Sequence, residues 1–265
     1  MPKHHPYSRI EFRRHLRAWL KRNFTMVAAA TAGLVALLAL VTVLLHFTLP
    51  ATPFRSWLIG VLQTGAVAAY LHLFYASFLA HDPVALSHVR GAWGEDNTRD
   101  ELQRALRRKV VWGWVDSLAL QYGDIDHLVV TREGGLVAID SKWRGNLNDG
   151  AEMARAARKV QLRAEALTRD LLKGRSRGTR RAKVNPLSIT AVVVLWGPAQ
   201  HVVAEGTRVD DIEFIAGREL VGWLTRLEGE PVSRDAALDI LRSWHSRRDQ
   251  TDKARASLNF PRTTD

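Results

Sequence analysis

The sequence predicts two transmembrane helices near the N-terminus, followed by a mixed α/β domain. Two long apolar runs without a formal charge, Phe24–Leu45 and Trp57–Ala80, predict the membrane helices. Strand-like and helix-like patterns that alternate after residue 83 predict the α/β domain. The chain of 265 residues is long enough for one full-sized domain with smaller attachments.

The charge balance of the chain is strongly basic. It has 38 Lys and Arg residues against 27 Asp and Glu residues, a formal net charge of +11. Such an excess predicts an anionic partner, either nucleic acid or lipid headgroups, and does not choose between them. The absence of cysteine excludes a disulfide framework and any metal site with cysteine ligands.

Residues 1–23 form a basic head, in which seven Lys or Arg side chains accompany a single acid, Glu11. Apolar residues such as Phe12, Leu16 and Trp19 are interleaved with the basic ones. Two interpretations stay open: an amphipathic helix that lies on an anionic leaflet, and a charge cluster that only sets the membrane topology.

The two apolar runs are joined by a short loop that contains Pro50 and Pro53. Each run holds the ~20 apolar residues that a bilayer requires, so residues 24–83 are expected to form a helical hairpin. The alternative is a cleaved signal peptide, but the first run is too long for one and no clear cleavage site follows it. Inside the second run, Gln63 and His72 are expected to form interhelical hydrogen bonds or to lie near an interface.

The distribution of basic residues predicts the orientation of the hairpin. The head carries seven basic residues, whereas the loop between the two runs carries only Arg55. The head is therefore expected in the cytoplasm, and an even number of crossings returns the chain to that side. The sequence thus predicts a multi-pass protein of the cell membrane with both termini and the α/β domain in the cytoplasm.

The chain after the hairpin is expected to form one domain over 84–248, followed by a polar tail over 249–265 without regular structure. Ile189–Trp196 is a continuous apolar run, typical of a strand that is buried on both faces. The pattern predicts helices at 94–108, 151–172, 217–227 and 233–248, and strands at 110–121, 126–131, 136–143, 189–196 and 212–216.

Two adjacent strands of this domain carry the residues that suggest chemistry. Side chains on a strand alternate between its two faces, so Asp140 and Lys142 share one face of their strand. If the turn before that strand is centred on Glu133, Asp126 on the preceding strand lies opposite Asp140. Gly134 is then expected to supply the positive φ that such a turn often needs.

Two carboxylates that face each other on neighbouring strands repel, and a cation between them removes the repulsion. Asp126 and Asp140 therefore predict a divalent cation site, and their oxygen ligands favour Mg²⁺ or Mn²⁺ over zinc. Lys142 lies one step along the same face. The alternative is a surface ion pair between Asp140 and Lys142 on an exposed sheet face.

A third acid, Glu95, lies at the start of the 94–108 helix. It precedes Leu102 by seven residues and Leu106 by eleven, so it shares their apolar helix face. A carboxylate that points toward a core needs a partner, and the predicted cation is one. The alternative is an acid that only complements the helix dipole.

These segments resemble the nuclease-related domain, NERD, a branch of the PD-(D/E)XK nuclease superfamily. The residues that carry the resemblance are Gly94 and Glu95, the segments Gly123–Val130 and Ala138–Trp143, and Gln161 in the following helix. The resemblance covers roughly residues 90–200. It implies a restriction-endonuclease-like mixed sheet flanked by helices and a metal-dependent phosphodiesterase activity. One departure is Asp140, because glutamate is commoner than aspartate at that position in the family.

The resemblance and the residue pattern together assign roles to the candidate site. The two aspartates are expected to bind Mg²⁺ or Mn²⁺, with the backbone carbonyl of Ser141 and the side chain of Glu95 as further ligands. Lys142 is expected to orient the attacking water or to stabilise charge in the transition state. Gln161 is implied to position a phosphate or the lysine.

Two further features offer contacts to nucleic acid. Six of the eleven residues in Lys173–Lys183 are basic, which suits a phosphate backbone, a membrane surface or plain solvent. Four tryptophans suit either base stacking or ordinary packing, and they are Trp93, Trp112, Trp114 and Trp143.

The sequence therefore predicts a membrane-anchored, Mg²⁺-dependent nuclease that acts on DNA or RNA at the cytoplasmic face. The alternative is a non-catalytic membrane adaptor in which the same fold binds nucleic acid or protein, and a third is a purely structural role. The intact set of Asp126, Asp140 and Lys142 favours the nuclease, since the loss of any one would favour the adaptor.

Overall fold

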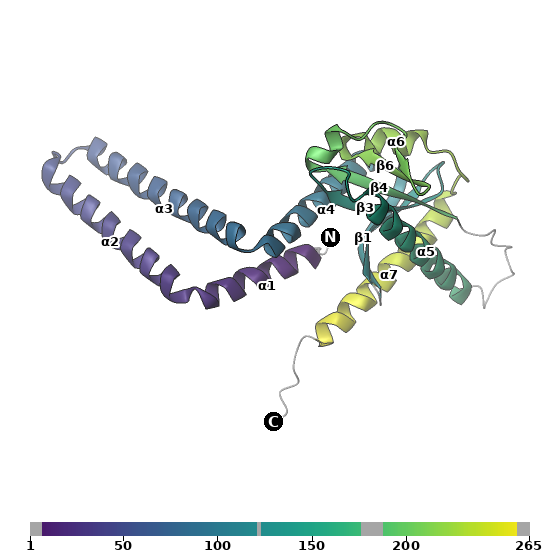
Figure 1. The fold of residues 1–265 in the computed structure, drawn as a ribbon, viewed down its shortest axis with the longest axis horizontal. Coiled ribbons are helices and arrows are strands. Elements are labelled where there is room, and N and C mark those ends of the chain that lie inside the picture. The colour runs from purple at the N-terminus through teal and green to yellow at the C-terminus, as the bar shows by residue number, and fades with distance from the viewer. Residues whose placement is uncertain (1–6, 121–122, 176–187, 259–265) are drawn as a thin grey trace, which may run out of the picture. The chain divides into compact units, whose positions relative to one another are not determined.

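The computed structural model describes residues 7–120, 123–175 and 188–258 (Figure 1). The chain divides into two compact units, one up to Val89 and the other from Arg90 onward. The first unit is helical, and the second contains the sheet.

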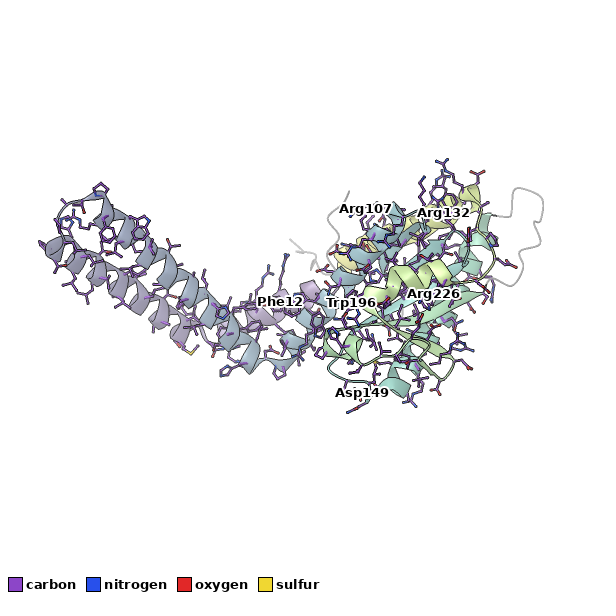
Figure 2. All side chains as sticks on the ribbon, turned by 90° about the horizontal axis from the view of Figure 1, so that it is seen from above. Phe12, Arg107, Arg132, Asp149, Trp196 and Arg226 are labelled. Atoms are coloured by element: carbon purple, nitrogen blue, oxygen red, sulfur yellow. The ribbon has the colours of Figure 1, made fainter. Side chains whose placement is uncertain are left out.

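The first unit is built from helices. Its elements are α1 (Tyr7–Arg22), α2 (Phe24–Thr48), α3 (Pro53–His81) and the first residues of α4 (Pro83–Arg107). Both α2 and α3 are long and apolar enough to cross a membrane. None of the residues in their apolar windows is buried, unlike the core helix of a soluble protein. Figure 2 shows that side chains project outward all along α2 and α3. These two helices agree with the predicted hairpin.

Polar side chains join α2 to α3 inside the apolar pair. The amide Nε2 of Gln63 donates a hydrogen bond to Thr42 Oγ1 at 2.9 Å. The hydroxyls of Thr31 and Tyr70 lie 2.7 Å apart and form a second link. Such bonds remove unsatisfied polar groups from an apolar environment. The interhelical hydrogen bond predicted for Gln63 is therefore confirmed, whereas the His72 side chain is exposed on the surface of α3.

The apolar side of α1 packs against the end of α3. Trp19 and Phe78 are buried in this cluster, and their rings meet edge to face with centroids 5.6 Å apart. Phe12 contacts Phe78 in the same way at 5.6 Å. The predicted amphipathic helix is therefore present, and its apolar side contacts α3. Its basic side, which includes Arg13 and Arg17, stays exposed.

The second unit is a mixed sheet of six strands in the order β1-β2-β3-β4-β6-β5, flanked by helices (Figure 1). Strands β3, β4 and β6 are parallel, and the other neighbours are antiparallel. The elements after α4 are β1 (Val111–Leu120), β2 (Gly123–Thr131), β3 (Leu136–Trp143), α5 (Gly150–Arg175), β4 (Ile189–Trp196), η1 (Gly197–His201), β5 (Arg208–Val209), β6 (Ile212–Ala216), η2 (Gly217–Glu219), α6 (Leu220–Arg226) and α7 (Arg234–Leu258). The predicted α/β class with a mixed sheet is confirmed.

Helices cover both faces of the sheet. On one face, α4 and α6 pack against the odd-numbered side chains of β2 and β3, such as Val129 and Ile139. On the other face, α5 and α7 pack against the even-numbered ones, such as Leu128 and Ala138. The central strand β4 is buried on both faces, as its continuous apolar run predicts. Asp126, Asp140 and Lys142 are even-numbered residues of β2 and β3, so strand alternation directs them toward the α5–α7 face.

The largest differences from the sequence predictions are the limits of two helices and one short strand. Helix α4 begins at Pro83 and not at residue 94, because Gly91 and Gly94 are tolerated inside the helix. Helix α7 runs to Leu258, so the prediction of an unstructured tail from residue 249 is wrong up to that residue. No Gly or Pro interrupts this helix, and good helix formers continue past Arg248. The two-residue strand β5 was not predicted at all.

Candidate active site

The β2–β3 hairpin has the register that the sequence predicts. His127 pairs with Ile139, and Leu128 pairs with Ala138. This register centres the turn on Glu133. One residue further from the turn, Asp126 on β2 therefore lies opposite Asp140 on β3. The residue with positive φ in this turn is Gly135, at +74°, and the prediction of Gly134 is wrong. Gly134 is required for another reason, because a Cβ there would lie 2.8 Å from the side chain of Leu227.

Asp126 is held by the backbone of the opposite strand. Its Oδ2 accepts a hydrogen bond from the backbone N–H of Ser141 at 2.8 Å. The Ser141 side chain points to the other face, where its hydroxyl lies 2.8 Å from Thr98 Oγ1 on α4. Both contacts fix the end of β3, so the carboxylate of Asp126 has a defined position beside Asp140 and Lys142.

Asp140 and Lys142 form an ion pair in which one carboxylate oxygen is used and the other is not. Lys142 Nζ lies 2.6 Å from Asp140 Oδ1. Asp140 is only 5% exposed, and its Oδ2 is buried without a hydrogen-bond partner in the described part of the chain. A buried carboxylate oxygen without a partner is costly unless a cation or water binds it. We call Asp126, Asp140 and Lys142 the acid–lysine cluster.

The two acids and the lysine perturb one another. Burial, together with the charges of Asp140 and Glu95, raises the pKa of Asp126 to about 7, against the lowering effect of Lys142. Burial and the charge of Arg144 lower the pKa of Lys142, but Asp140 and Asp126 outweigh them and raise the pKa above its ordinary value. The lysine therefore stays an ammonium ion at neutral pH, while Asp126 titrates near neutrality.

Glu95 lies near the cluster without completing a three-residue metal site. It is half-buried on α4, where the backbone of Gly94 approaches β3 closely: a Cβ on Gly94 would lie 3.7 Å from the backbone nitrogen of Trp143. Glu95 is close enough to raise the pKa of Asp126. In the ranges that the structure describes, no three His, Asp or Glu side chains gather as a metal site. The structure thus brings Asp126, Asp140 and Lys142 together, with Glu95 as a nearby charge.

Gln161 lies away from the cluster, and the site role implied for it does not fit this structure. Its Nε2 donates to the backbone carbonyl of Ile189 at 2.6 Å, and Arg158 donates to its Oε1 at 2.9 Å. Ile189 pairs with Leu136, the first residue of β3. Lys142 lies six residues further along that strand, a distance of about 20 Å at ~3.3 Å per residue. Gln161 therefore anchors α5 to the opposite end of the sheet.

A buried polar network beside the cluster was not predicted from the sequence. Asp116 on β1 accepts hydrogen bonds from Arg99 on α4, from Trp114 Nε1 at 2.7 Å and from His127 Nδ1 at 2.8 Å. Burial raises the pKa of Asp116, but His127 and Arg99 outweigh it and hold the pKa far below its usual range. The sequence did contain one sign of this network, because Asp116 is the one acid in a largely apolar strand, and such an acid indicates a buried ion pair. This network ties α4, β1 and β2 together next to Asp126.

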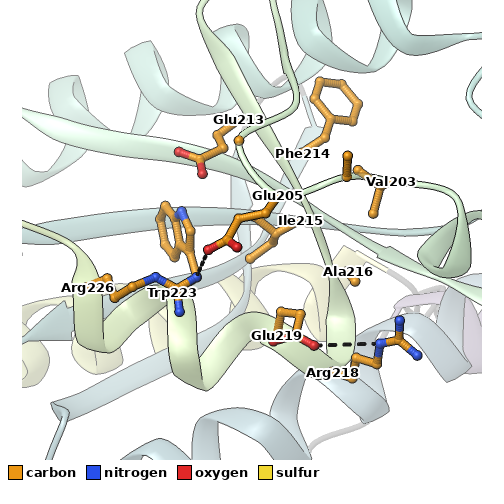
Figure 3. Close-up of a pocket in the computed structure, with 12 residues that line it drawn as sticks. Val203, Glu205, Glu213, Phe214, Ile215, Ala216, Arg218, Glu219, Trp223 and Arg226 are labelled. Atoms are coloured by element: carbon orange, nitrogen blue, oxygen red, sulfur yellow. Dashed lines mark hydrogen bonds and ion pairs between the residues drawn. The ribbon is translucent and has the colours of Figure 1, made fainter.

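A pocket of about 300 Å³ lies elsewhere in the second unit, where β6 meets η2 and α6 (Figure 3). Its two arginines pair with carboxylates of the same lining: Arg226 lies 2.7 Å from Glu205, and Arg218 lies 3.7 Å from Glu219. Trp223 forms part of its apolar lining. Because its arginines are already paired with carboxylates, this pocket has little free positive charge for an anionic ligand. The acid–lysine cluster, in contrast, has a buried carboxylate oxygen that can bind a cation.

The comparisons with known proteins agree with this geometry. Residues 90–196 match the family model described as nuclease-related domain, NERD. No curated protein and no solved structure matches the chain. The matched segment begins with the second unit and ends with β4, so it contains Glu95, the β2–β3 hairpin and the whole acid–lysine cluster. Over residues 90–196, this chain is therefore similar to the nuclease-related domain family, NERD.

Proposed function

We propose that the protein is a membrane-anchored, metal-dependent nuclease that hydrolyses phosphodiester bonds of DNA or RNA. The observation that carries this proposal is the acid–lysine cluster, in which a buried Asp140 oxygen has no partner among the described residues and Lys142 lies beside it. Buried titratable groups with strongly shifted pKa values are typical of active sites. The match to a nuclease-related domain supports the reaction class.

The cluster fits a hard divalent cation. Asp140 Oδ2 and the carboxylate of Asp126 are the candidate ligands, and the backbone carbonyl of Ser141 remains a candidate third. Oxygen donors of this kind suit Mg²⁺ or Mn²⁺. When bound, such an ion lowers the pKa of a water molecule and neutralises charge on a phosphate. The cation would also remove the repulsion that raises the pKa of Asp126.

Each side chain of the cluster has a separate task in this proposal. Lys142 keeps its proton because Asp140 and Asp126 favour the charged form. Its ammonium group is therefore available to orient a nucleophile or to stabilise the negative charge that develops on the phosphate oxygens. The backbone N–H of Ser141 holds Asp126 in place, so little reorganisation of this carboxylate is needed.

A second candidate function is a non-catalytic adaptor that binds nucleic acid or protein at the membrane. The observation that favours it is the ion pair between Asp140 and Lys142, which uses one of the carboxylate oxygens of Asp140. A closed ion pair of this kind can stabilise a fold without chemistry. The two candidates differ in one property, the dependence of phosphodiester cleavage on a divalent cation.

The direct test uses the full-length chain purified in detergent micelles. Plasmid DNA and labelled DNA and RNA oligonucleotides are incubated with Mg²⁺, with Mn²⁺ or with EDTA. The nuclease proposal expects cleavage with the cations and none with EDTA. Asp140→Asn, prepared identically, controls for contaminating nucleases. Absence of cleavage under every cation condition would favour the adaptor.

The membrane anchor is expected to place both termini in the cytoplasm. The basis is the pair of long apolar helices and the basic head, which includes Arg13 and Arg17 on the exposed side of α1. Reporter enzymes fused before residue 1 and after residue 83 would measure the side of the membrane at each point. Activity on the outer side at the fusion after residue 83 would contradict the topology. A third fusion between α2 and α3, after residue 50, should report the outer side.

A further inference from the structure

Trp93 stands apart from the other large aromatic residues of the second unit. It is 47% exposed, and among the described residues from Arg90 onward it is the one Trp, Tyr or Phe side chain that is exposed. Other tryptophans donate their indole N–H inside the unit: Trp112 to Val232, Trp114 to Asp116, Trp196 to Thr98 and Trp244 to Thr168. Their packing role is clear, whereas the outer surface of Trp93 serves no packing in this unit.

Trp93 lies at the strand end that carries the acid–lysine cluster, on the α4–α6 face of the sheet, whereas the side chain of Lys142 is directed to the other face. Its ring centroid lies 5.5 Å from that of Trp143, the residue that directly follows Lys142. The next residue on the helix is Gly94, which lies close to the backbone of Lys142 and Trp143. A side chain larger than a methyl group would not fit between the helix and the strand there. Helix α4 therefore presents Trp93 beside the end of β3, and Trp143 supports the indole.

A positive charge lies at the same strand end. Arg144 makes no ion pair with a carboxylate in the described ranges, and its Nε is buried without a hydrogen-bond partner there. Its charge is close enough to Lys142 to act on the ammonium group. An arginine that has no acidic partner in the described ranges, beside a candidate phosphodiesterase site, suits a phosphate group. The end of β3 thus offers an aromatic surface and a guanidinium within one short stretch.

We propose that Trp93 is a stacking platform for an unpaired base, and that the substrate of this site is therefore nucleic acid with single-stranded character. The proposal rests on the nuclease function and specifies its substrate class. In a duplex each base is covered on both faces by its neighbours, so only an unstacked base can lie on an indole ring. Stacking of a base on an aromatic side chain contributes about 1–3 kcal/mol and tolerates any sequence. Arg144 contacts the adjoining phosphate.

The first test is equilibrium binding by the full-length protein in lipid nanodiscs, with EDTA present so that cleavage does not interfere. The probes are a fluorescein-labelled single-stranded oligonucleotide and a fully paired two-stranded duplex of equal phosphate number. Trp93→Ala is expected to weaken single-strand binding about tenfold, and Trp93→Phe should retain most of it. Duplex binding should change little. The matched control is Leu162→Ala, an exposed apolar side chain of the same unit, which should leave both affinities unchanged.

A second measurement identifies the stacked base directly. Single abasic sites are placed at successive positions of the single-stranded probe. An abasic site at one position should lower the affinity of the wild type about tenfold. The same abasic site should not lower the affinity of the Trp93→Ala variant any further. Additive losses at every position would overturn the stacking role. Equal weakening of single-strand and duplex binding by Trp93→Ala would also overturn it.

The alternative for an exposed tryptophan in a membrane protein is contact with the lipid interface. Because the chain has no cysteine, a Trp93→Cys variant can carry a single nitroxide label. The proposal expects the label to be accessible to a water-soluble relaxation agent and protected by the single-stranded oligonucleotide at a concentration that saturates the Trp93→Ala variant. Accessibility to oxygen in the lipid, with no protection by the oligonucleotide, would overturn it. Normal cation-dependent cleavage of single strands by Trp93→Ala would reject the platform and leave the nuclease function intact.

Discussion

Replacing Lys142 with alanine is expected to slow phosphodiester cleavage about 10²–10³-fold while leaving Mn²⁺ binding largely intact. The carboxylates of Asp126 and Asp140 would hold the cation, whereas the ammonium group acts on the nucleophile and on the developing charge. Cleavage of a labelled oligonucleotide at saturating Mn²⁺ measures the first effect. A calorimetric Mn²⁺ titration of the same preparation measures the second.

Two control variants make this result interpretable. Lys159→Ala removes an exposed lysine of α5 that makes no ion pair in the described part of the chain, and its cleavage rate should match the wild type. Asp140→Asn removes a candidate ligand, so it should weaken Mn²⁺ binding and cleavage together. Undiminished cleavage by Lys142→Ala and Asp140→Asn, in protein free of contaminating nucleases, would show that the cluster is not the active site. The adaptor function would then be preferred.

The loss of Lys142 also changes the charge balance of the cluster. Its ammonium group lowers the pKa of Asp126 and is paired with Asp140 at 2.6 Å. Without it, the two buried acids lose the positive charge that most strongly lowers the pKa of Asp126, so they bind protons or a cation more strongly. Mn²⁺ affinity is therefore expected to rise slightly in Lys142→Ala at pH 8. Thermal unfolding with Mn²⁺ present confirms that the variant is folded, since a cation that binds the native state stabilises it.

The β2–β3 hairpin and its acids could be predicted from the sequence because the rules involved are local. Strand alternation places Asp140 and Lys142 on one face, and the turn length fixes Asp126 opposite Asp140. The apolar runs of α2 and α3 are equally local, since length and composition alone identify a helix that can cross a membrane. The match of residues 90–196 to a nuclease-related domain agrees with that interpretation of the pattern.

The features that could not be predicted depend on contacts between distant parts of the chain. Gln161 was assigned to the site by its place in the helix after β3, but the direction of α5 carries it to Ile189 at the other end of the sheet. The network of Asp116 joins α4 to β1 and β2, and no spacing rule connects Arg99 with His127. The apolar side of α1 fits a membrane surface as well as it fits Phe78 of α3. Residues 176–187, which hold most of the basic segment Lys173–Lys183, lie outside the described ranges.

The stability of the fold is expected to depend on pH through Asp126. Its pKa is about 7 in the folded chain, against an ordinary value of 3.8. Between these values the folded state keeps a proton that the unfolded state has released. The free energy of unfolding should therefore fall as pH rises from about 4 to 7, by up to ~1.4 kcal/mol per pH unit, and this effect should level off above pH 7. Mg²⁺ or Mn²⁺, which binds the ionised carboxylate, should restore stability most strongly at pH 8.

Asp126→Asn is expected to remove this pH dependence and to unfold at a higher temperature than the wild type at pH 8 without metal. Asparagine keeps an oxygen that can accept the hydrogen bond from the Ser141 N–H. The matched control is Asp116→Asn, a buried acid on the neighbouring strand whose pKa is lowered by His127 and Arg99. Asp116 in its ionised form stabilises the fold above its unfolded pKa, so Asp116→Asn should lose stability at pH 8. Thermal unfolding of both variants between pH 5 and 8, with EDTA and with Mn²⁺, measures these opposite changes in stability. If Asp126→Asn were the less stable variant at pH 8 in EDTA, Asp126 would be a supporting ion-pair residue, and the repulsion that motivates the metal site would be absent.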